Sequence, residues 1–585
     1  MSSPSIAPGR QLLLSRAIPM TWVLLLAMAI NGPLLMLQVP NYSHNANLHK
    51  FFASHYAQRW FDPWNEKWFT GFSQTTLPPL AHQWTAFFSR FISLNLAYML
   101  TQLIGILLVV IGVYRYSRIW LGERGASYAA LGSIFLGSMA LLVYSEGDLP
   151  TVCAAGLFLN ALPYFYAWSR ASKWTSLLKG IFLAVAAAAT QLSTVTFGTL
   201  LFGLPVLVTA IIDRRRDERE TSGAAVLVRA IFFAAVAAAG IAVVLWPFLK
   251  QPSIPQMSLP NPSRENYFTN FDTLITYWIL PWGAIILALP FIFSRGLRES
   301  RYLPLFLGLW VTLIFGLGGT TILTKMVLGD RYDLTDFQHF NFWATLMSLP
   351  LVAILAVQLI NRHGQKAIIS LGMLAALTFG FAMGWPAFHP DTDTMLNSGE
   401  ISSFMNRDGH DTYRYLTLGF GSKVSEVGTD TIASSIDGEY SPGRLLPELI
   451  PYGSLQLTNA RYYGAKGMEA LKAVLKHADQ YGLRYIFVRD PYYAPLLAFA
   501  GWRTEEIYDQ GIVILWVKDG VPPAHPNDYA GKPTTMDGLM WGTLPFGSSL
   551  MALLLVLVLP ERRRQLEAIE FPVITSEEPL LKEAR

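Results

Sequence analysis

Long apolar runs, separated by short polar stretches, fill the first two thirds of the chain and return once near its end. A helix that crosses a bilayer needs about 20 mostly apolar residues. The pattern therefore predicts an α-helical polytopic membrane protein with about 12 transmembrane helices. The predicted helices cover residues 17–38, 94–114, 125–143, 151–168, 176–192, 195–212, 225–247, 273–293, 303–324, 340–360, 367–386 and 541–559.

Basic residues follow every even-numbered predicted helix. Loops rich in Lys and Arg remain on the cytoplasmic side of a membrane. We therefore expect both termini in the cytoplasm, and residues 39–93, 144–150, 248–272 and 325–339 outside. The basic residues that define this orientation are Arg115, Arg118, Arg124, Arg170, Lys173, Arg214, Arg215, Arg216, Arg295, Arg298, Arg301, Arg362, Lys366, Arg562, Arg563 and Arg564.

The polar stretch 387–540 has a different pattern, which predicts a small extracytoplasmic α/β domain. Short apolar runs at Arg414–Leu418, Arg484–Val488 and Ile512–Val517 are typical of buried strands. Met468–His477 has helical periodicity, and Gly482 is a plausible helix end. The expected organisation is a membrane domain (1–386) with a large first external loop (39–93), the α/β domain (387–540), a last transmembrane helix (541–560) and a cytoplasmic tail (561–585).

Composition agrees with a membrane protein. The chain of 585 residues is 52% hydrophobic and only 14% charged, whereas about a quarter of a soluble protein is charged. The formal net charge is +4, and the arginines occur in short loop clusters, so we expect no nucleic-acid partner. The single cysteine, Cys153, excludes an intramolecular disulfide and favours the cytoplasmic membrane of a bacterium and a role in its cell envelope.

The first external loop has the densest set of chemically useful side chains. Residues 41–84 contain four of the ten histidines, together with Asp62, Glu66 and four tryptophans. Leu48–Trp60 is amphipathic, so we expect a helix at the membrane interface with Phe51 and Phe52 against lipid. Aromatic residues and histidines also occur at interfaces for reasons of solvation alone.

Two further external segments carry acids. Glu146 and Asp148 lie close enough in sequence to share a cation or to divide acid and base roles. The alternative is that Asp148 is the N-cap of the helix that begins with Leu149-Pro150. Before Gln338 and His339, an acidic cluster surrounds Arg331, which could hold a phosphate or pair with its own loop. Its acids are Asp330, Asp333 and Asp336.

The order of these motifs resembles the GT-C superfamily, multispanning glycosyltransferases that use lipid-phosphate-linked sugars. More closely, it is similar to bacterial membrane proteins labelled "6-pyruvoyl-tetrahydropterin synthase-related". Their first loop reads G-H-D-x-x-x-H, then Y-P-x-W, G-Y/F and P-P-L. The matching residues here are Ser43-His44-Asn45, His49, Pro63-Trp64, Gly71-Phe72, Pro78-Pro79-Leu80, Gly147-Asp148-Leu149-Pro150, Gln191–Thr194 and Gln338-His339-Phe340.

The resemblance implies a GT-C-like fold and transfer of a sugar from a polyprenyl-phosphate donor to an extracytoplasmic acceptor. In this superfamily an acidic first-loop residue is the general base or assists a cation, but the matching residue here is Asn45. We therefore expect the catalytic groups among His44, His49 and Asp148. A divalent cation, Mg²⁺ or Mn²⁺, would assist the donor phosphate. The expected substrate-binding residues are Asn45, Asp62, Glu146, Gln191, Arg331, Gln338 and His339.

Asn45 also favours an alternative, a non-catalytic binding or assembly protein on the same scaffold, because an amide cannot accept a proton at neutral pH. A transporter of lipid-linked glycans is a weaker option, since the apolar helices contain few ionisable residues. These motifs leave open the donor sugar, the acceptor, the stereochemical outcome and the oligomeric state.

Overall fold

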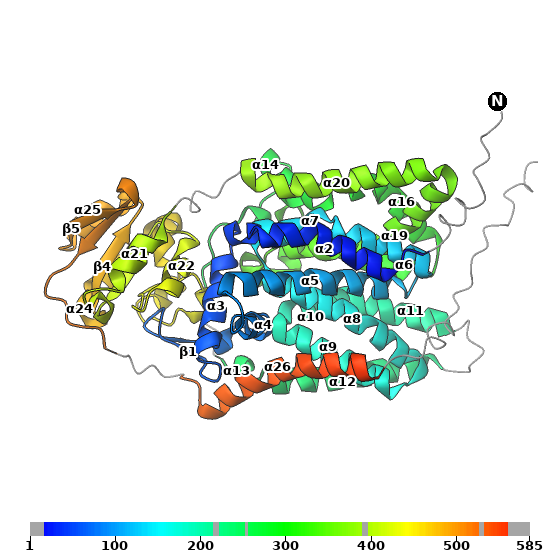
Figure 1. Cartoon of the computed structure of the whole chain (residues 1–585), viewed down its shortest axis with the longest axis horizontal. Helices are drawn as coiled ribbons and strands as arrows, with labels where there is room; N and C mark the ends of the chain where they lie inside the picture. Colours follow the sequence, from blue (N-terminus) through cyan, green and yellow to red (C-terminus); the bar gives the residue numbers. More distant parts are fainter. Residues whose placement is uncertain (1–16, 215–221, 252–255, 389–395, 526–531, 560–585) are drawn as a thin grey trace, which may run out of the picture.

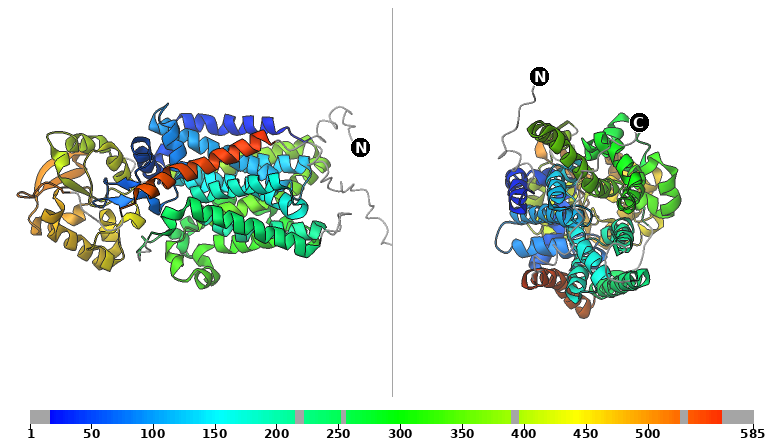
Figure 2. Two further views of the ribbon diagram at one scale, coloured as in Figure 1. Left: turned by 90° about the horizontal axis from the view of Figure 1, so that it is seen from below. Right: turned by 90° about the vertical axis from the view of Figure 1, so that its right-hand side faces the viewer.

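The computed structural model describes residues 17–214, 222–251, 256–388, 396–525 and 532–559. A bundle of long helices forms one part of the molecule, and a smaller domain with a sheet lies beyond one end of the bundle (Figure 1). Figure 2 shows the same arrangement from below and along the bundle. The predicted tail (561–585) lies outside the described residues.

The bundle consists of helices from both ends of the sequence. Its long members are α2 (Met20–Met36), α5 (Leu94–Ser117), α6 (Glu123–Ile134), α8 (Leu149–Ala171), α9 (Trp174–Thr190), α11 (Leu204–Arg214), α12 (Gly223–Val244), α16 (Ile285–Arg298), α17 (Leu303–Gly316), α19 (Gln338–His363), α20 (Gln365–Phe388) and α26 (Thr535–Val558). Shorter helices are α3 (Ala46–Gln58), α4 (Leu80–Phe88), α7 (Gly137–Ala140), α10 (Leu192–Gly198), α13 (Trp246–Leu249), α14 (Phe271–Leu274), α15 (Leu280–Trp282) and α18 (Ile322–Leu328).

Seven helical segments in the described part of the chain are long and apolar enough to cross a membrane, or nine if two bent pairs each count as one span. The bent pairs are Glu123–Ile134 with Gly137–Glu146, and Phe271–Trp282 with Ile285–Arg298. Three shorter apolar helices, α2, α9 and α17, occupy the other predicted segments. A polytopic membrane protein is therefore confirmed, whereas the count of twelve spans stays a prediction.

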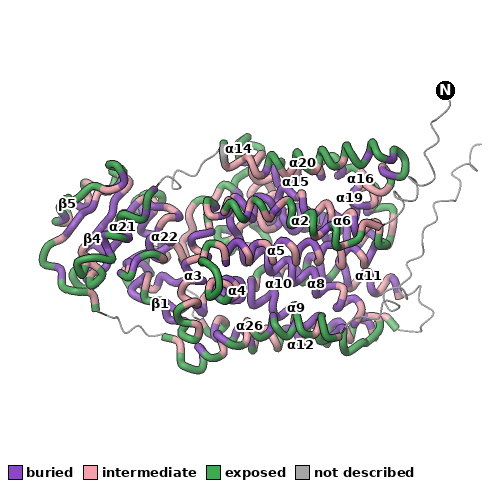
Figure 3. Tube along the Cα trace, in the orientation of Figure 1, coloured by how far each residue is buried: buried purple, intermediate pink, exposed green. Residues whose placement is uncertain are grey.

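Burial distinguishes the centre of the bundle from its surface. In α8, 89% of the most apolar window is buried, but in α20 only 11% is buried. Figure 3 shows the same contrast, with α8 largely purple inside and α20 largely green outside. The exposed side chains of α20 are themselves apolar, including Met373, Leu377 and Phe381, which is expected of a helix that faces lipid.

Contacts between loops show that successive helices run in opposite directions. At one end of the bundle, Asp213 in the last turn of α11 forms an ion pair with Arg301 before α17, and it accepts a hydrogen bond from Tyr166 near the end of α8. At the other end, the loop before α8 contacts the loop after α2 and the start of α19. The ends of α8 and α11 and the segment before α17 thus meet at one end, and the candidate site lies at the other.

The sheet domain has four strands in the order β3-β4-β6-β5. β3 and β4 are parallel, and the other two neighbouring pairs are antiparallel. The strands are β3 (Arg414–Leu418), β4 (Leu483–Val488), β5 (Arg503–Tyr508) and β6 (Val513–Val517). The helices are α21 (Ser398–Met405), α22 (Lys423–Asp430), α23 (Gly464–Lys476), α24 (Ala478–Tyr481) and α25 (Ala494–Phe499).

Alternating side chains of β4 contribute to two separate cores. Leu483, Ile486 and Val488 pack on the face that is covered by α23. Tyr485 and Phe487 pack on the opposite face, which is covered by α21 and α22. Because both faces are covered, the strands are mostly apolar, which is why short apolar runs predicted β3, β4 and β6. The fourth strand, β5, has exposed side chains along almost its whole length and gave no such signal.

The core on the second face also contains the aromatic residues of the first loop. Phe51, Phe52 and Trp68 are each at most 1% exposed and belong to the same buried cluster as Phe487. The expectation that Phe51 and Phe52 lie against lipid is therefore wrong, because α22 covers this face of α3 instead. A Cβ atom on Gly438 would lie 2.3 Å from the Trp68 ring, so the close approach requires glycine.

Candidate functional site

The candidate site forms around the start of α8, at the end of the bundle that faces the sheet domain. Asp148 is the N-cap of α8: its carboxylate accepts hydrogen bonds from the Thr151 backbone N–H at 3.2 Å and from the Thr151 hydroxyl at 2.7 Å. Pro150 occupies the first turn, where its missing N–H costs nothing. The predicted capping role of Asp148 is confirmed.

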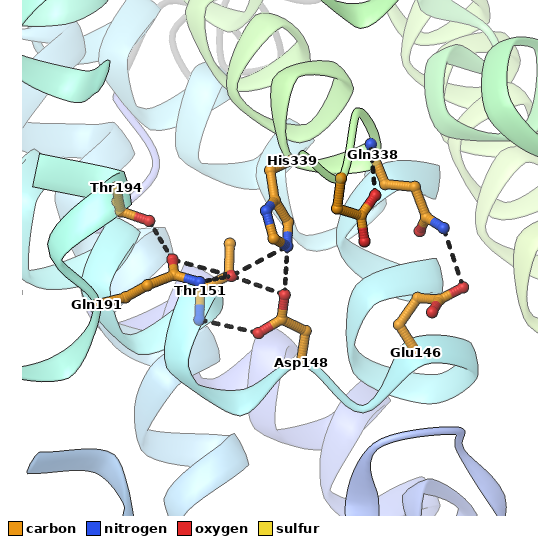
Figure 4. A network of polar contacts seen from close by, with 8 residues as sticks. Glu146, Asp148, Thr151, Gln191, Thr194, Gln338 and His339 are labelled. Carbon is orange, nitrogen blue, oxygen red and sulfur yellow. Dashed lines mark hydrogen bonds and ion pairs between the residues drawn. The ribbon is translucent and has the colours of Figure 1, made fainter. Parts of the chain in front are cut away.

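Asp148 also joins α8 to α19. Its Oδ2 atom lies 2.5 Å from Nε2 of His339, so His339 donates from Nε2 and Nδ1 is the nitrogen left for a ligand (Figure 4). Burial would by itself raise the pKa of Asp148, but the neighbouring His339 and the Thr151 hydroxyl lower this pKa to about 2. Asp148 is therefore ionised at neutral pH and is a weak proton acceptor.

The break between α9 and α10 contributes an amide to the same network. Gln191 lies between the two helices with an extended backbone, so α9 ends at Thr190 and not at the predicted residue 192. Its Nε2 donates to the Thr151 hydroxyl at 2.7 Å, and its Oε1 accepts from Thr194. Thr151 and His339 thus bond to the Asp148 carboxylate, and Gln191 joins the network through Thr151 (Figure 4).

Glu146 lies on the other side of this network and has more acceptor capacity. It is half-buried, and its carboxylate accepts a hydrogen bond from Nε2 of Gln338 at 3.3 Å. The Gln338 backbone N–H in turn donates to Asp336 at 3.0 Å. Tyr277 also interacts with Gln338. A carboxylate has about four acceptor positions, so Glu146 can accept a further proton donor.

The first loop is joined to this network through its backbone. The N–H groups of His44 and Asn45 donate to the carbonyls of Ser145 at 3.0 Å and Glu146 at 2.8 Å. Gly147 has φ of +70°, and a Cβ atom there would lie 2.2 Å from the Ser43 hydroxyl. The position of Asn45, where the superfamily has its acidic residue, is therefore directly beside Glu146.

His49 is buried and pairs with another histidine of the first loop. Its Nδ1 lies 3.0 Å from Nε2 of His82, which comes from α4. Burial lowers the pKa of His49 to about 4, although the charge of Asp148 acts in the opposite direction. Burial and the neighbouring His49 lower the pKa of His82 well below its ordinary value. Both rings are therefore neutral at physiological pH, and one must donate to the other.

Two of the predicted substrate-binding residues lie away from the network. The Asp62 side chain is about half exposed, forms an ion pair with Arg59 and accepts a hydrogen bond from the Trp64 backbone. Arg331 is exposed on the turn before α19. His44, by contrast, is exposed beside Glu146 and interacts with it electrostatically.

The residues present do not fit a divalent-cation site. In the described part of the chain, no group of three or more His, Cys, Asp or Glu side chains is arranged to hold a metal ion. Asp148 already accepts hydrogen bonds from His339 and Thr151, and Gln338 donates to both Glu146 and Asp336. A requirement for Mg²⁺ or Mn²⁺ stays a prediction.

An apolar groove of about 470 Å³ runs along the bundle and ends next to the network. At one end it is lined by Phe340, the residue after His339, and at the other by Ile212 and Ser300, which adjoin the Asp213–Arg301 pair. Along α17 it extends from Leu303 to Phe315, or about 18 Å at 1.5 Å per helical residue. It therefore crosses much of the apolar layer.

Sequence reasoning missed Thr151 and Tyr277. Thr151 carried a signal, because a hydroxyl three residues after an N-cap acid commonly reaches back to it. Tyr277 lies within an apolar run that breaks into α14 and α15, and its proximity to Gln338 depends on tertiary packing.

The fold is similar to solved membrane glycosyltransferases at low sequence identity. ArnT from Cupriavidus metallidurans bound to undecaprenyl phosphate matches with a TM-score of 0.50 at 12% identity, over 87% of this chain and 100% of that chain. The arabinofuranosyltransferase AftD from Mycobacteria gives 0.54 at 14% identity, over 88% and 40% respectively. The apo oligosaccharyltransferase of Archaeoglobus fulgidus gives 0.50 at 13% identity, over 86% and 75%.

No protein-family model and no curated protein matches the chain. The structural likeness nevertheless shows that the chain has the fold of GT-C membrane glycosyltransferases.

Proposed function

We propose that the chain is a membrane glycosyltransferase that moves a sugar from a polyprenyl-phosphate donor to an acceptor outside the cytoplasmic membrane. The observation that carries the proposal is Glu146, a half-buried carboxylate with spare acceptor capacity beside an ordered Asp148–His339 pair. The likeness to ArnT, whose structure is bound to undecaprenyl phosphate, supports the class of donor.

Each group in the network has a distinct role in this proposal. Glu146 accepts the proton of the acceptor hydroxyl as that oxygen bonds to the anomeric carbon of the donor sugar. The bond between the anomeric carbon and the phosphate oxygen breaks, and polyprenyl phosphate leaves. Asp148 orients His339 through Nε2, and a protonated His339 donates its Nδ1–H to the donor phosphate, as does the amide group of Gln191.

The lipid tail of the donor has a place in the same geometry. The groove that ends at Phe340 would let an isoprenoid chain lie against apolar side chains while its phosphate reaches His339. The proposed route places the tail along α17, with its far end near Ser300.

The orientation in the membrane is part of the proposal: a bacterial cytoplasmic membrane, with both termini inside and the sheet domain outside. Cys153 is buried, so an introduced surface cysteine can be labelled selectively. A membrane-impermeant maleimide should label Ala498→Cys in intact cells, but Thr175→Cys only after permeabilisation. The reverse result would contradict the orientation.

The activity test uses the full chain in nanodiscs with radiolabelled polyprenyl-phosphate sugars. We expect sugar transfer to water or to an added acceptor, and weaker donor binding in Val311→Trp, which fills the groove. Val228→Trp, on the exposed face of α12, is the matched control. Donor binding without any transfer or hydrolysis would favour the non-catalytic alternative that Asn45 suggests. Absence of donor binding would contradict both.

A relationship to the narrower set labelled "6-pyruvoyl-tetrahydropterin synthase-related" stays a prediction, and we attach no pterin chemistry to it. The cation requirement is checked by the same assay with EDTA and with Mg²⁺ or Mn²⁺ added back.

A further inference from the structure

A polar cavity, separate from the apolar groove, lies between the helix bundle and the sheet domain. Its volume is about 660 Å³, within the range of about 300–1,000 Å³ that is typical of small-molecule sites. The bundle side is formed by residues 256–265 and by Tyr332 and Asp333. The sheet domain contributes residues 451–453 and Lys466. No part of the function proposed above uses this cavity.

The wall of this cavity is firmly constructed. The Met257 backbone N–H donates to the carbonyl of Gly453 at 2.7 Å, which ties the loop to the sheet domain. Arg264 donates to the carbonyls of Thr335 at 3.2 Å and Leu259 at 3.1 Å. It also donates to the Ser258 hydroxyl at 3.0 Å. The cation is therefore held in place before any ligand binds, which lowers the entropic cost of binding.

The loop that carries Arg264 is itself fixed by close packing. Gly318, with φ of +51°, and Gly319 lie against the carbonyls of Ser263 and Arg264 so closely that a Cβ atom would be 2.1 Å and 2.0 Å away. The Tyr332 hydroxyl donates to the Arg264 carbonyl at 2.7 Å. The backbone of this wall is thus determined by contacts on both sides.

The chemistry of the lining points to a neutral ligand with many hydroxyl groups. Two cations, Arg264 and Lys466, are balanced by two carboxylates, Glu265 and Asp333. A charged ligand would be attracted by the two side chains of opposite charge and repelled by the two of like charge. Carboxylates and guanidinium groups together can accept from and donate to the hydroxyls of a sugar, and Tyr452 offers a ring for its apolar face.

The cavity lies within reach of the candidate site. Asp333 lines the cavity, and Gln338 bonds to Glu146. The two residues are five positions apart in the sequence, so their Cα atoms are at most about 18 Å apart even in a fully extended chain. Asp336, between them, interacts electrostatically with both Arg264 and Glu146. A carbohydrate bound in the cavity could therefore extend a terminal hydroxyl toward Glu146.

We propose that this cavity binds the acceptor and that the acceptor is a neutral carbohydrate of more than one sugar unit. The inference rests on the proposed glycosyltransferase function and adds the class of acceptor and its location. Arg264, Asp333 and Tyr452 position the acceptor, whereas Glu146 acts on its reacting hydroxyl.

The test is glycan binding by the full chain in nanodiscs on an array of neutral and anionic glycans. Affinity for the best neutral glycan is then measured for Asp333→Ala and Tyr452→Ala. We expect each to weaken binding by about tenfold, the size of one good aromatic or polar contact. Tyr492→Ala, a half-exposed tyrosine elsewhere on the sheet domain, is the matched control and should bind as the unaltered chain does.

Glu146→Gln separates the two proposals, because it should lose sugar transfer while keeping glycan binding. If the unaltered chain transfers sugar but Asp333→Ala and Tyr452→Ala bind glycan normally, the cavity assignment is overturned. The proposed enzymatic function would then still stand. Cavity-dependent glycan binding without transfer in the unaltered chain would overturn the enzymatic function and support only the ligand class. Binding to anionic glycans alone, or to none, would overturn the inference.

Discussion

Two buried carboxylates, one at each end of the bundle, join helices in similar ways but have different partners. At the end away from the sheet domain, Asp213 meets Arg301 at 3.2 Å and accepts from Tyr166. At the other end, Asp148 meets His339 at 2.5 Å and accepts from Thr151. Arginine keeps its charge and forms several fixed hydrogen bonds, whereas histidine has a second ring nitrogen that can serve a ligand.

The neighbours of the two pairs differ even more. Arg301 also donates to the carbonyl of Ile119, so that pair is closed by further bonds. Beside the Asp148–His339 pair, Glu146 receives an amide at 3.3 Å and keeps room for another donor. One end of the bundle therefore holds helices together through an ion pair with several bonds. The other end leaves acceptor positions open on the Glu146 carboxylate, which the proposed function uses.

The largest expected effect that would test this contrast is loss of activity in Glu146→Gln. The amide keeps the shape of the side chain but cannot accept the proton, so we expect sugar transfer to fall by about 10²- to 10⁴-fold. Rates are measured with saturating donor in nanodiscs. Glu123→Gln, an exposed glutamate at the opposite end, is the matched control and should keep full activity. Equal activity in both variants would remove Glu146 from the mechanism.

The second prediction concerns Asp213→Ala, which leaves the Arg301 charge buried without its partner. Such a loss costs about 3–5 kcal/mol of unfolding free energy. We expect a clear fall in the thermal midpoint of the purified chain, with normal transfer activity per folded molecule. If Asp213→Ala had a normal thermal midpoint but no transfer activity, the catalytic groups would lie near Asp213 and not near Glu146.

The third prediction concerns acid stability and the His49–His82 pair. In the unfolded chain a histidine binds a proton below about pH 6.5. The folded His49 binds one only near its pKa of about 4. Stability should therefore fall as pH decreases from about 6.5 to 4, by about 3 kcal/mol for His49 alone.

The measurement is the thermal midpoint of the full chain across that pH range. His49→Gln should flatten the dependence, whereas His477→Gln, at a half-exposed position on the sheet domain, should not. An equal slope in all three proteins would show that the buried pair does not govern acid stability.

The smallest expected effect is that of Asp62→Asn, which tests a residue outside both networks. Its ion pair with Arg59 spans 3.6 Å between half-exposed side chains, so we expect a change of no more than about 1 kcal/mol in unfolding free energy. Transfer activity should stay unchanged in the nanodisc assay. A large loss of activity would return Asp62 to the site that the sequence assigned to it.

Much of the fold could be predicted because its signals are local. Apolar length identified the helices, and short continuous apolar runs identified β3, β4 and β6. The capping role of Asp148 and the break at Gln191 were also local features. Strand β5 was missed because it is an exposed edge strand whose pairing with β6, rather than side-chain burial, defines it.

The candidate site was only partly predictable. Five of the predicted site residues do converge: Glu146, Asp148, Gln191, Gln338 and His339. The sequence does not reveal that Asp148 accepts a hydrogen bond from His339 or that Glu146 keeps unused acceptor positions. That distinction depends on His339 approaching from a helix almost two hundred residues away. The environment of Phe51 and Phe52 was mispredicted for the same reason, since amphipathicity does not reveal whether lipid or protein covers a face.

The packing of Trp68 against Gly428 and Gly438 has a consequence for protein engineering. The first loop and the sheet domain share one aromatic core, so neither is a detachable module. A truncation after α20 would expose Phe51, Phe52 and Trp68 and leave an apolar patch that promotes aggregation. Chimaeras with proteins of the same fold should therefore exchange the loop and the domain together.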